Sequence, residues 1–219
     1  MISGRLKSLV KYINVKDKVI DIGTDHALLP IYLIKNKVLK TIVIADNKET
    51  ALNNGINNIK LYKLTKQIIP KLGNGLAVID KNINTVIISG IGGQTIIKIL
   101  SHPNLIYLKK IILQPSRDYL QVRKHLINKG YYIKDEEVIL DKGRYYLNIV
   151  FKKGNKKYSK QALKYGPILI HKNKEYHEYL LKKQEYILKN IPKHKIVTII
   201  KTKKEINILK KIISKIRDK

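Results

Sequence analysis

The chain has 219 residues and no cysteine. This absence excludes disulfide bonds, zinc sites built on thiolates, and thiol nucleophiles. Tryptophan is also absent and phenylalanine occurs once, so the 14 tyrosines supply almost all the aromatic surface. A chain without disulfides suits a reducing compartment, and we expect a cytoplasmic protein.

Long apolar runs are lacking as well. No stretch approaches the roughly 18 consecutive apolar residues of a membrane span. The N-terminal segment MISGRLKSLVKYI interrupts its apolar residues with charges, so it lacks the apolar core of a signal peptide. The sequence therefore predicts a protein without membrane contact.

Acidic residues are scarce. The chain has 16 Asp and Glu and 45 Lys and Arg, which gives a formal net charge of +29. Such a field attracts polyanions and predicts a nucleic acid partner. An AT-rich genome is the alternative source of this composition, since the cations are nearly all lysine. The excess is densest in residues 152–219, with 21 Lys and Arg against 5 Asp and Glu.

Short apolar runs alternate with segments of helical periodicity in the first part of the chain. The predicted strands are 18–22, 41–45, 67–69, 85–89 and 110–113. The predicted helices are 4–13, 28–38, 48–59, 93–101 and 117–129. Uninterrupted apolar strands that alternate with helices indicate a parallel sheet covered on both faces.

The pattern changes after Gly130. Two strand-like runs, 131–140 and 144–151, are joined by Asp141-Lys142-Gly143, which has the composition of a hairpin turn. A nicotinamide dehydrogenase would continue with another strand and helix instead. The predicted fold class is therefore α/β, a Rossmann-like seven-stranded methyltransferase sheet with a C-terminal antiparallel hairpin.

The remaining residues predict a separate basic helical part. Residues 152–157 (KKGNKK) resemble a linker, and residues 195–201 (KIVTIIK) form a β-rich connector of ambiguous structure. One helical face carries Tyr176, Tyr179, Leu180, Lys183, Tyr186, Ile187 and Asn190, and a second carries Ile206, Leu209, Ile213 and Ile216. We expect a small coiled-coil-like helical hairpin with its tyrosines mostly packed between the helices. The predicted domains are a catalytic domain, 1–152, and a nucleic-acid-binding domain, 153–219.

The main candidate site follows the first strand, in the segment DIGTDHALLP. Gly23 allows close approach of a ligand to the backbone, but no Gly-x-Gly-x-x-Gly pattern offers a pyrophosphate its usual cradle. Asp21 and Asp25 would also repel phosphate. They suit a ligand with a cationic amino-acid end, such as S-adenosylmethionine, although a plain turn with a satisfied aspartate is the alternative.

Further candidate residues end the later strands, where open parallel sheets bind their ligands. Asp46 can accept both ribose hydroxyls, or cap a helix. Asn74 and Gly75 can meet an adenine edge, or form a simple turn. Ser89, Gly90, Gly92 and Gly93 open a helix, and Gln114 lies on the same predicted rim. We assign Ser89 and Gly90 to the cofactor, and Gly92, Gly93 and Gln114 to the substrate.

The motifs DIGTDHALLP, ISGIGG and ILQPSRD, followed by a hairpin and a basic helical tail, resemble the bacterial TrmK-type tRNA methyltransferases. That resemblance covers the full chain. It implies methyl transfer from S-adenosylmethionine to ring nitrogen 1 of adenine 22 in tRNA. It also implies that the tail binds tRNA. Methyltransferases of this fold acting on another RNA or a small molecule, and a non-catalytic RNA-binding protein, remain as alternatives.

The resemblance also implies roles for individual residues. The loop of Asp21, Gly23, Asp25 and His26 would line the cofactor and the active site. Gly90, Gly92 and Gly93 correspond to the glycine motif, and Ser3, Arg5 and Leu6 to an early Ser-x-Arg-Leu segment, from which we assign Arg5 to the substrate. The chain departs from the family in having Leu28 at a usually aromatic position, Asn74 at a usually acidic one, and Asp46 where glutamate is more common.

Asp25 is the first candidate for a catalytic group, because a carboxylate beside the exocyclic amine of adenine can accept its proton. His26 is the alternative. We expect no metal, and a monomer.

Overall fold

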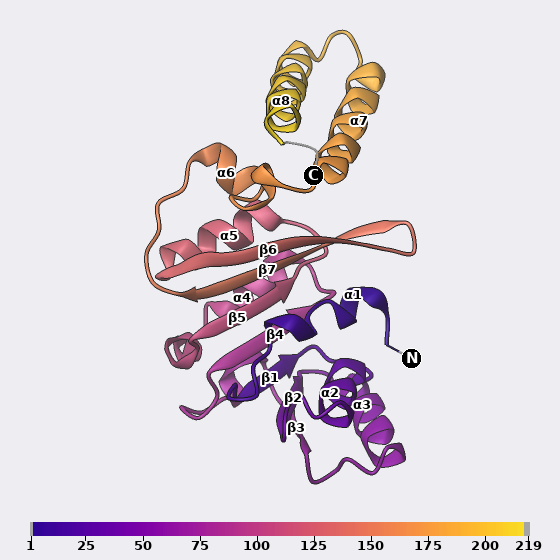
Figure 1. Cartoon of the computed structure of the whole chain (residues 1–219), viewed down its shortest axis with the longest axis vertical. Coiled ribbons are helices and arrows are strands. Elements are labelled where there is room, and N and C mark those ends of the chain that lie inside the picture. Colours follow the sequence, from indigo (N-terminus) through magenta and orange to yellow (C-terminus); the bar gives the residue numbers. More distant parts are fainter. Residues whose placement is uncertain (1, 217–219) are drawn as a thin grey trace. The chain divides into compact units, whose positions relative to one another are not determined.

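The computed structural model describes residues 2–216 and divides the chain into two compact units, Met1–Lys157 and Tyr158–Lys219. The division falls at the end of the polar segment 152–157. Figure 1 shows an α/β first unit and a helical second unit. Within the described residues, no helix combines the length and the apolar character that a bilayer crossing requires.

The first unit is built on one sheet of seven strands in the order β3-β2-β1-β4-β5-β7-β6. The parallel strands are β1 (Val19–Ile22), β2 (Ile42–Asp46), β3 (Ile68–Leu72), β4 (Thr85–Ser89) and β5 (Lys110–Gln114). The antiparallel pair is β6 (Tyr131–Asp141) and β7 (Arg144–Lys153), and β7 also pairs with β5. This confirms the predicted fold class. The chain builds the sheet outward from β1 to β3 on one side and then continues with β4 on the other side of β1. The carboxyl ends of β1 and β4 therefore flank a crevice that suits a ligand.

Helices and short 3₁₀ turns connect these strands. They are α1 (Gly4–Lys7), η1 (Val10–Tyr12), α2 (Leu28–Lys35), α3 (Glu49–Leu61), η2 (Gly75–Val78), α4 (Gly93–Leu100), η3 (Pro103–Tyr107) and α5 (Tyr119–Asn128). The predicted helix 4–13 is two short pieces, α1 and η1. The weak third strand is longer than predicted and includes Pro70, which an edge strand tolerates because one side of its backbone needs no ladder partner.

The core of the first unit follows the alternation of side chains along the strands. One buried cluster joins Leu9, Leu33 and Ile59, from the helical segments, to Ile44 and Ile87 of the sheet. Strand neighbours of such residues point to the opposite face. Figure 1 shows α4 and α5 grouped apart from α2 and α3. Successive residues of β1 and β4 are buried, so both faces of these central strands are covered, which explains their uninterrupted apolar sequence.

The second unit contains α6 (Lys160–Tyr165), η4 (Leu169–His171), α7 (Lys174–Asn190) and α8 (Ile196–Lys215). The ambiguous segment 195–201 forms the start of α8, with Lys195 as the N-cap, and α6 was not predicted from the sequence. Figure 1 shows α7 and α8 side by side as a helical hairpin. Their contact buries Leu209 and Ile212, with Leu180 and Leu181 packed against them.

The prediction that the tyrosines pack between these helices was wrong. Tyr179 is 45% exposed and Tyr186 is 71% exposed, whereas His177 of the same helix is fully buried. When apolar residues occur on several sides of a helix, more than one face satisfies spacings of three and four. The spacing alone therefore could not identify the face that is buried. On α8, Ile212 is buried and Ile213 is only half-buried.

Candidate functional site

The loop after β1 has an unusual backbone. Gly23, Asp25 and Ala27 have φ values of 74°, 40° and 52°. Glycine adopts this left-handed region readily, but aspartate and alanine do so only where surrounding contacts hold them. The sharp bends carry Asp25 and His26 over the carboxyl ends of the strands, where a ligand binds in sheets of this kind.

Helix α3 holds this loop in place. Asn54 Nδ2 donates to Asp25 Oδ1 at 3.4 Å, and Asn58 Nδ2 donates to the carbonyl oxygen of His26 at 3.0 Å. A side chain on Gly55 would bring a Cβ to 3.2 Å from the carbonyl oxygen of Asp25. The side chains of Asp25 and His26 remain more than half exposed, with Asp25 Oδ2 and His26 Nε2 3.5 Å apart. Both groups are thus positioned and accessible.

Asp21 differs from Asp25 because it is 4% exposed. Burial raises the pKa of its carboxyl to about 7, and the hydrogen bond that Thr24 Oγ1 donates at 2.9 Å opposes this shift. Within residues 2–216, no cationic side chain pairs with Asp21. A buried carboxylate without a cation is costly to ionise. It therefore fits a ligand that brings its own positive charge.

Two cavities meet at this loop. The larger, about 530 Å³, is lined by residues that include Asp46, Asn74 and Gly75. The smaller, about 300 Å³, is lined by Arg5, Asp21, His26, Ser89 and Gly90, among others. Gly23, Asp25 and Ile91 line both cavities. The two cavities therefore adjoin beside Asp25.

The structure explains some of the residue types in the larger cavity. The backbone N–H of Lys48 donates to Asp46 Oδ1 at 2.9 Å, which orients this carboxylate at the end of β2. Gly75 has φ of 58°, and an added Cβ would lie 3.0 Å from the Ile99 side chain. Only glycine suits that position. Asp46, Asn74 and Gly75 thus line one cavity, and their binding of a cofactor stays a prediction.

Gln114 is 1% exposed and, of the described residues, is not among those that line either cavity. Arg5 Nη1 donates to Gln114 Oε1 at 3.0 Å. Gln114 Nε2 donates to the carbonyl oxygen of Arg5 at 3.0 Å and to Asn148 Oδ1 at 2.7 Å. The guanidinium of Arg5 also lies 5.4 Å from the centre of the Tyr146 ring. In the structure Gln114 thus orients Arg5, and its own contact with a substrate stays a prediction.

Gly92 and Gly93 are likewise not among the described residues lining these cavities. A Cβ on Gly93 would lie 2.6 Å from Asp118 Cβ and 2.7 Å from the carbonyl oxygen of Arg117. The start of α4 therefore needs a glycine to pack against the turn before α5. The three atoms nearest to a Cβ on Gly92 would all belong to the guanidinium of Arg117, the closest at 3.3 Å.

Sequence reasoning missed two residues here. Ile91 lies in the shared wall of the cavities, and its position between two glycines was the available signal. Arg117, whose side chain is 78% exposed, adds a cation beside Gly92 and belongs to the motif ILQPSRD. In residues 2–216, no three His, Asp or Glu side chains group as ligands of a metal would.

The strand order, the terminal hairpin and the carboxylate-rich loop define a Rossmann-like methyltransferase. Residues 2–149 match the family described as a methyltransferase domain. The chain is 28% identical to the tRNA (adenine(22)-N(1))-methyltransferase of Bacillus subtilis over 158 residues, which span 71% of this chain and 66% of that enzyme.

Solved structures agree with this class over nearly the whole chain. The TrmK of M. capricolum, in complex with S-adenosyl-homocysteine, is 32% identical, with a TM-score of 0.85 over 99% of this chain and 100% of that one. A Streptococcus pneumoniae protein in complex with S-adenosyl-L-methionine is 25% identical, with a TM-score of 0.88 over 97% and 100% of the two chains. The chain belongs to the TrmK family of tRNA methyltransferases.

The buried carboxyl of Asp21 should make binding of a cationic ligand depend on pH. Because its pKa is raised to about 7, binding of S-adenosylmethionine must first remove a proton at lower pH. Affinity should weaken by up to about tenfold per unit as pH falls from 7 to 5.5. Titration calorimetry across this range measures it. Asp21→Asn should bind more than tenfold more weakly at pH 7 and lose this pH dependence; an unchanged slope would exclude Asp21 as its origin.

The same carboxyl should affect stability. A raised folded-state pKa means that stability is present below the unfolded pKa, near 4, and is lost as pH rises through 7. Without ligand, Asp21→Asn should therefore melt at a higher temperature than the wild type at pH 8, with the difference shrinking toward pH 4. Thermal unfolding at a series of pH values checks this. A lower melting temperature for Asp21→Asn at pH 8 would contradict it.

The neighbouring glycines provide a matched test of packing. Gly93→Ala should lower the free energy of unfolding by about 1–3 kcal/mol, because its Cβ meets backbone and a Cβ that cannot move aside. Gly92→Ala should change it little, because the end of a flexible arginine faces it. Denaturant unfolding compares the two variants. Equal losses would show that close packing does not distinguish these positions.

Proposed function

We propose that this protein transfers a methyl group from S-adenosylmethionine to ring nitrogen 1 of adenine at position 22 of tRNA. The observation that carries the proposal is the buried, cation-free carboxylate of Asp21 beside two joined cavities, in a chain of the TrmK family. The M. capricolum and Streptococcus pneumoniae relatives hold S-adenosyl-homocysteine and S-adenosyl-L-methionine. When bound, the cofactor supplies an electrophilic methyl group on its sulfonium.

The residues of the two cavities have chemistry that matches the parts of this cofactor. Asp21 would pair with the ammonium group, next to Ser89 and Gly90. Asp46 would accept hydrogen bonds from the ribose hydroxyls, and Asn74 and Gly75 would flank the adenine. The absence of a glycine-rich phosphate cradle favours a sulfonium nucleoside over a dinucleotide.

Asp25 is the proposed catalytic residue. Ring nitrogen 1 of adenine is itself a nucleophile, so methyl transfer is mainly a matter of in-line positioning. The product carries a positive charge until its exocyclic amine loses a proton. Asp25 lines both cavities and keeps an exposed carboxylate, which supports its assignment as the proton acceptor. His26, in the smaller cavity, is the alternative group. Arg5 in the same cavity, with Gly92 and Gly93 nearby in sequence, would face the incoming nucleotide.

The basic second unit would bind the body of the tRNA. Its lysines supply phosphate contacts, and the exposed rings of Tyr179 and Tyr186 add surfaces on which unpaired bases can stack. The reaction requires no metal, because the sulfonium already activates the methyl group. We infer that the enzyme acts as a monomer in the cytoplasm, and sedimentation at working concentrations tests the first of these inferences.

Substitution of Asp25 tests the catalytic assignment. Asp25→Asn should lower kcat for tRNA methylation by about 10²- to 10⁴-fold, because the amide cannot accept a proton. The dissociation constant of S-adenosylmethionine should stay within about threefold, since Asp21 supplies the ammonium contact. His26→Ala is the matched comparison, with a smaller expected loss. Equal loss of turnover and cofactor affinity in Asp25→Asn would assign Asp25 to cofactor binding instead.

Removal of the second unit tests its role. A chain of residues 1–157 should bind S-adenosylmethionine normally but lose at least about a hundredfold of tRNA affinity, since it lacks the basic helices. Calorimetry and filter binding measure the two affinities. Full methylation of tRNA by the shortened chain would refute a tRNA-binding role for residues 158–219.

A further inference from the structure

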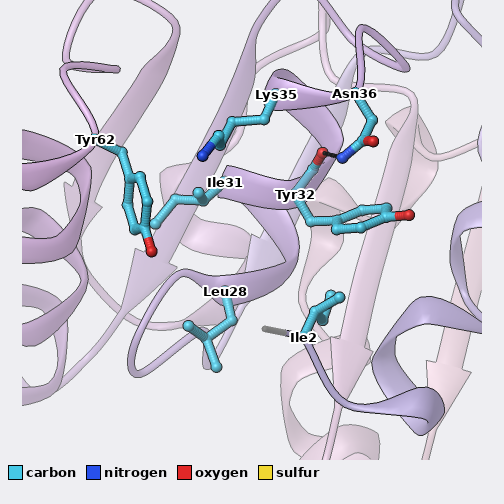
Figure 2. Close-up of a pocket in the computed structure, with 7 residues that line it drawn as sticks. All are labelled: Ile2, Leu28, Ile31, Tyr32, Lys35, Asn36 and Tyr62. Atoms are coloured by element: carbon cyan, nitrogen blue, oxygen red, sulfur yellow. Dashed lines mark hydrogen bonds between the residues drawn. The ribbon is translucent and has the colours of Figure 1, made fainter.

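A third cavity lies beside α2. We name it the α2 pocket; it has a volume of about 230 Å³ and is lined by Ile2, Leu28, Ile31, Tyr32, Lys35, Asn36 and Tyr62. Figure 2 shows the side chains of Leu28, Ile31, Tyr32 and Lys35 projecting from α2, with Tyr62 on one side and Ile2 on the other. The lining is mostly apolar, with one cation, one amide and no acid.

Two large apolar side chains of this pocket are unusually open to solvent. Leu28 is 43% exposed and Tyr62 is 46% exposed. The ammonium nitrogen of Lys35 lies 4.6 Å from the centre of the Tyr62 ring. This cation–π contact keeps a positive charge beside an aromatic ring. A nucleotide suits this pair of groups, because its planar base can stack on a ring and its phosphate can pair with a cation.

The α2 pocket adjoins the proposed reaction site. Leu28 lines both this pocket and the smaller cavity that contains Asp25 and His26. Leu28 is the first residue of α2 and directly follows the strained loop of Asp25 and Ala27. A ligand that fills the smaller cavity and extends past Leu28 enters the α2 pocket.

A polynucleotide substrate extends in this way. Placing one base in a reaction site requires the base to leave its stack, which also exposes the bases beside it. An exposed neighbour is stabilised when it stacks on an aromatic side chain. The α2 pocket is also smaller than the roughly 300–1,000 Å³ of pockets for whole drug-sized ligands, so it suits a single ring system.

We propose that the α2 pocket binds the base of a nucleotide directly adjacent to the target adenosine, stacked on Tyr62. This inference rests on the proposed tRNA methyltransferase function and adds a second nucleotide site to it. The pocket then contributes to substrate selection, because a nucleotide held there fixes its neighbour over Asp25. Tyr62 acts in tRNA binding and touches neither reacting group.

The experiment combines a protein change with a tRNA change. Tyr62→Leu keeps an apolar side chain but removes the stacking surface, and Tyr62→Phe keeps the ring as the matched control. Each is compared with the wild type on unmodified tRNA and on tRNAs with an abasic site at nucleotide 21 or 23. The measurements are the tRNA dissociation constant and kcat/KM for methylation, with the cofactor dissociation constant as a control for folding.

We expect Tyr62→Leu to weaken tRNA binding about tenfold, with cofactor affinity unchanged. An abasic site at one of the two flanking positions should weaken wild-type binding to a similar degree. The same abasic site should cause little further loss with Tyr62→Leu, because the stacking partner is already absent. Tyr62→Phe should behave like the wild type on all three tRNAs, and so should Tyr107→Ala, which removes an exposed tyrosine of η3 that does not line this pocket.

Two results would overturn the inference while the proposed function stands. One is a wild-type tRNA affinity in Tyr62→Leu, together with wild-type methylation of adenine 22. The other concerns the combination of Tyr62→Leu with an abasic tRNA. If the loss of affinity in the combination equals the product of the two separate losses at both position 21 and position 23, Tyr62 and these bases do not interact. Failure of the wild type to methylate any tRNA would instead refute the proposed function, and the inference with it.

Discussion

The site depends on the burial of one carboxylate. Asp21 lies in β1, the central parallel strand whose neighbours are β2 and β4, and is almost inaccessible to solvent. Water cannot stabilise its charge there, and within the described residues the protein provides one hydroxyl, from Thr24, and no cation. In the unliganded protein, burial therefore raises the pKa of this carboxyl to about 7. A cationic ligand would complete the site electrostatically, and cofactor binding would then depend on the geometry of the sheet.

The loop that follows Asp21 positions Asp25, the proposed catalytic residue. Its left-handed residues would relax in a free peptide, but α3 holds Asp25 and the backbone of His26 through two asparagines and leaves room for them at Gly55. The loop thus separates one buried carboxylate from one accessible carboxylate four residues later. The two groups suit different tasks, since burial favours charge pairing and exposure favours proton exchange with a substrate.

A buried polar network supports the other side of the site. Gln114 and Asn148 connect Arg5 to Ser8 across β5, β7 and the N-terminal segment, so a residue near the start of the chain reaches the wall of the smaller cavity. Burial of these amides is tolerated because their groups find partners in one another. Gln114 was predicted as a residue of the rim, and its position at the end of β5 is correct. Its burial could not be predicted, because the covering segment lies more than a hundred residues away in the sequence.

The amino-acid sequence by itself determined the succession of strands and helices along the chain, the terminal hairpin and the loops that carry the candidate residues. These features follow from local periodicity and turn chemistry. The family resemblance supplied the reaction. Only the tertiary structure decided that Gly93 accommodates the turn before α5, that Tyr179 and Tyr186 face solvent, and that Leu28 joins two cavities. Each of these facts depends on which distant surfaces meet, and a periodic pattern along one chain segment does not contain that information.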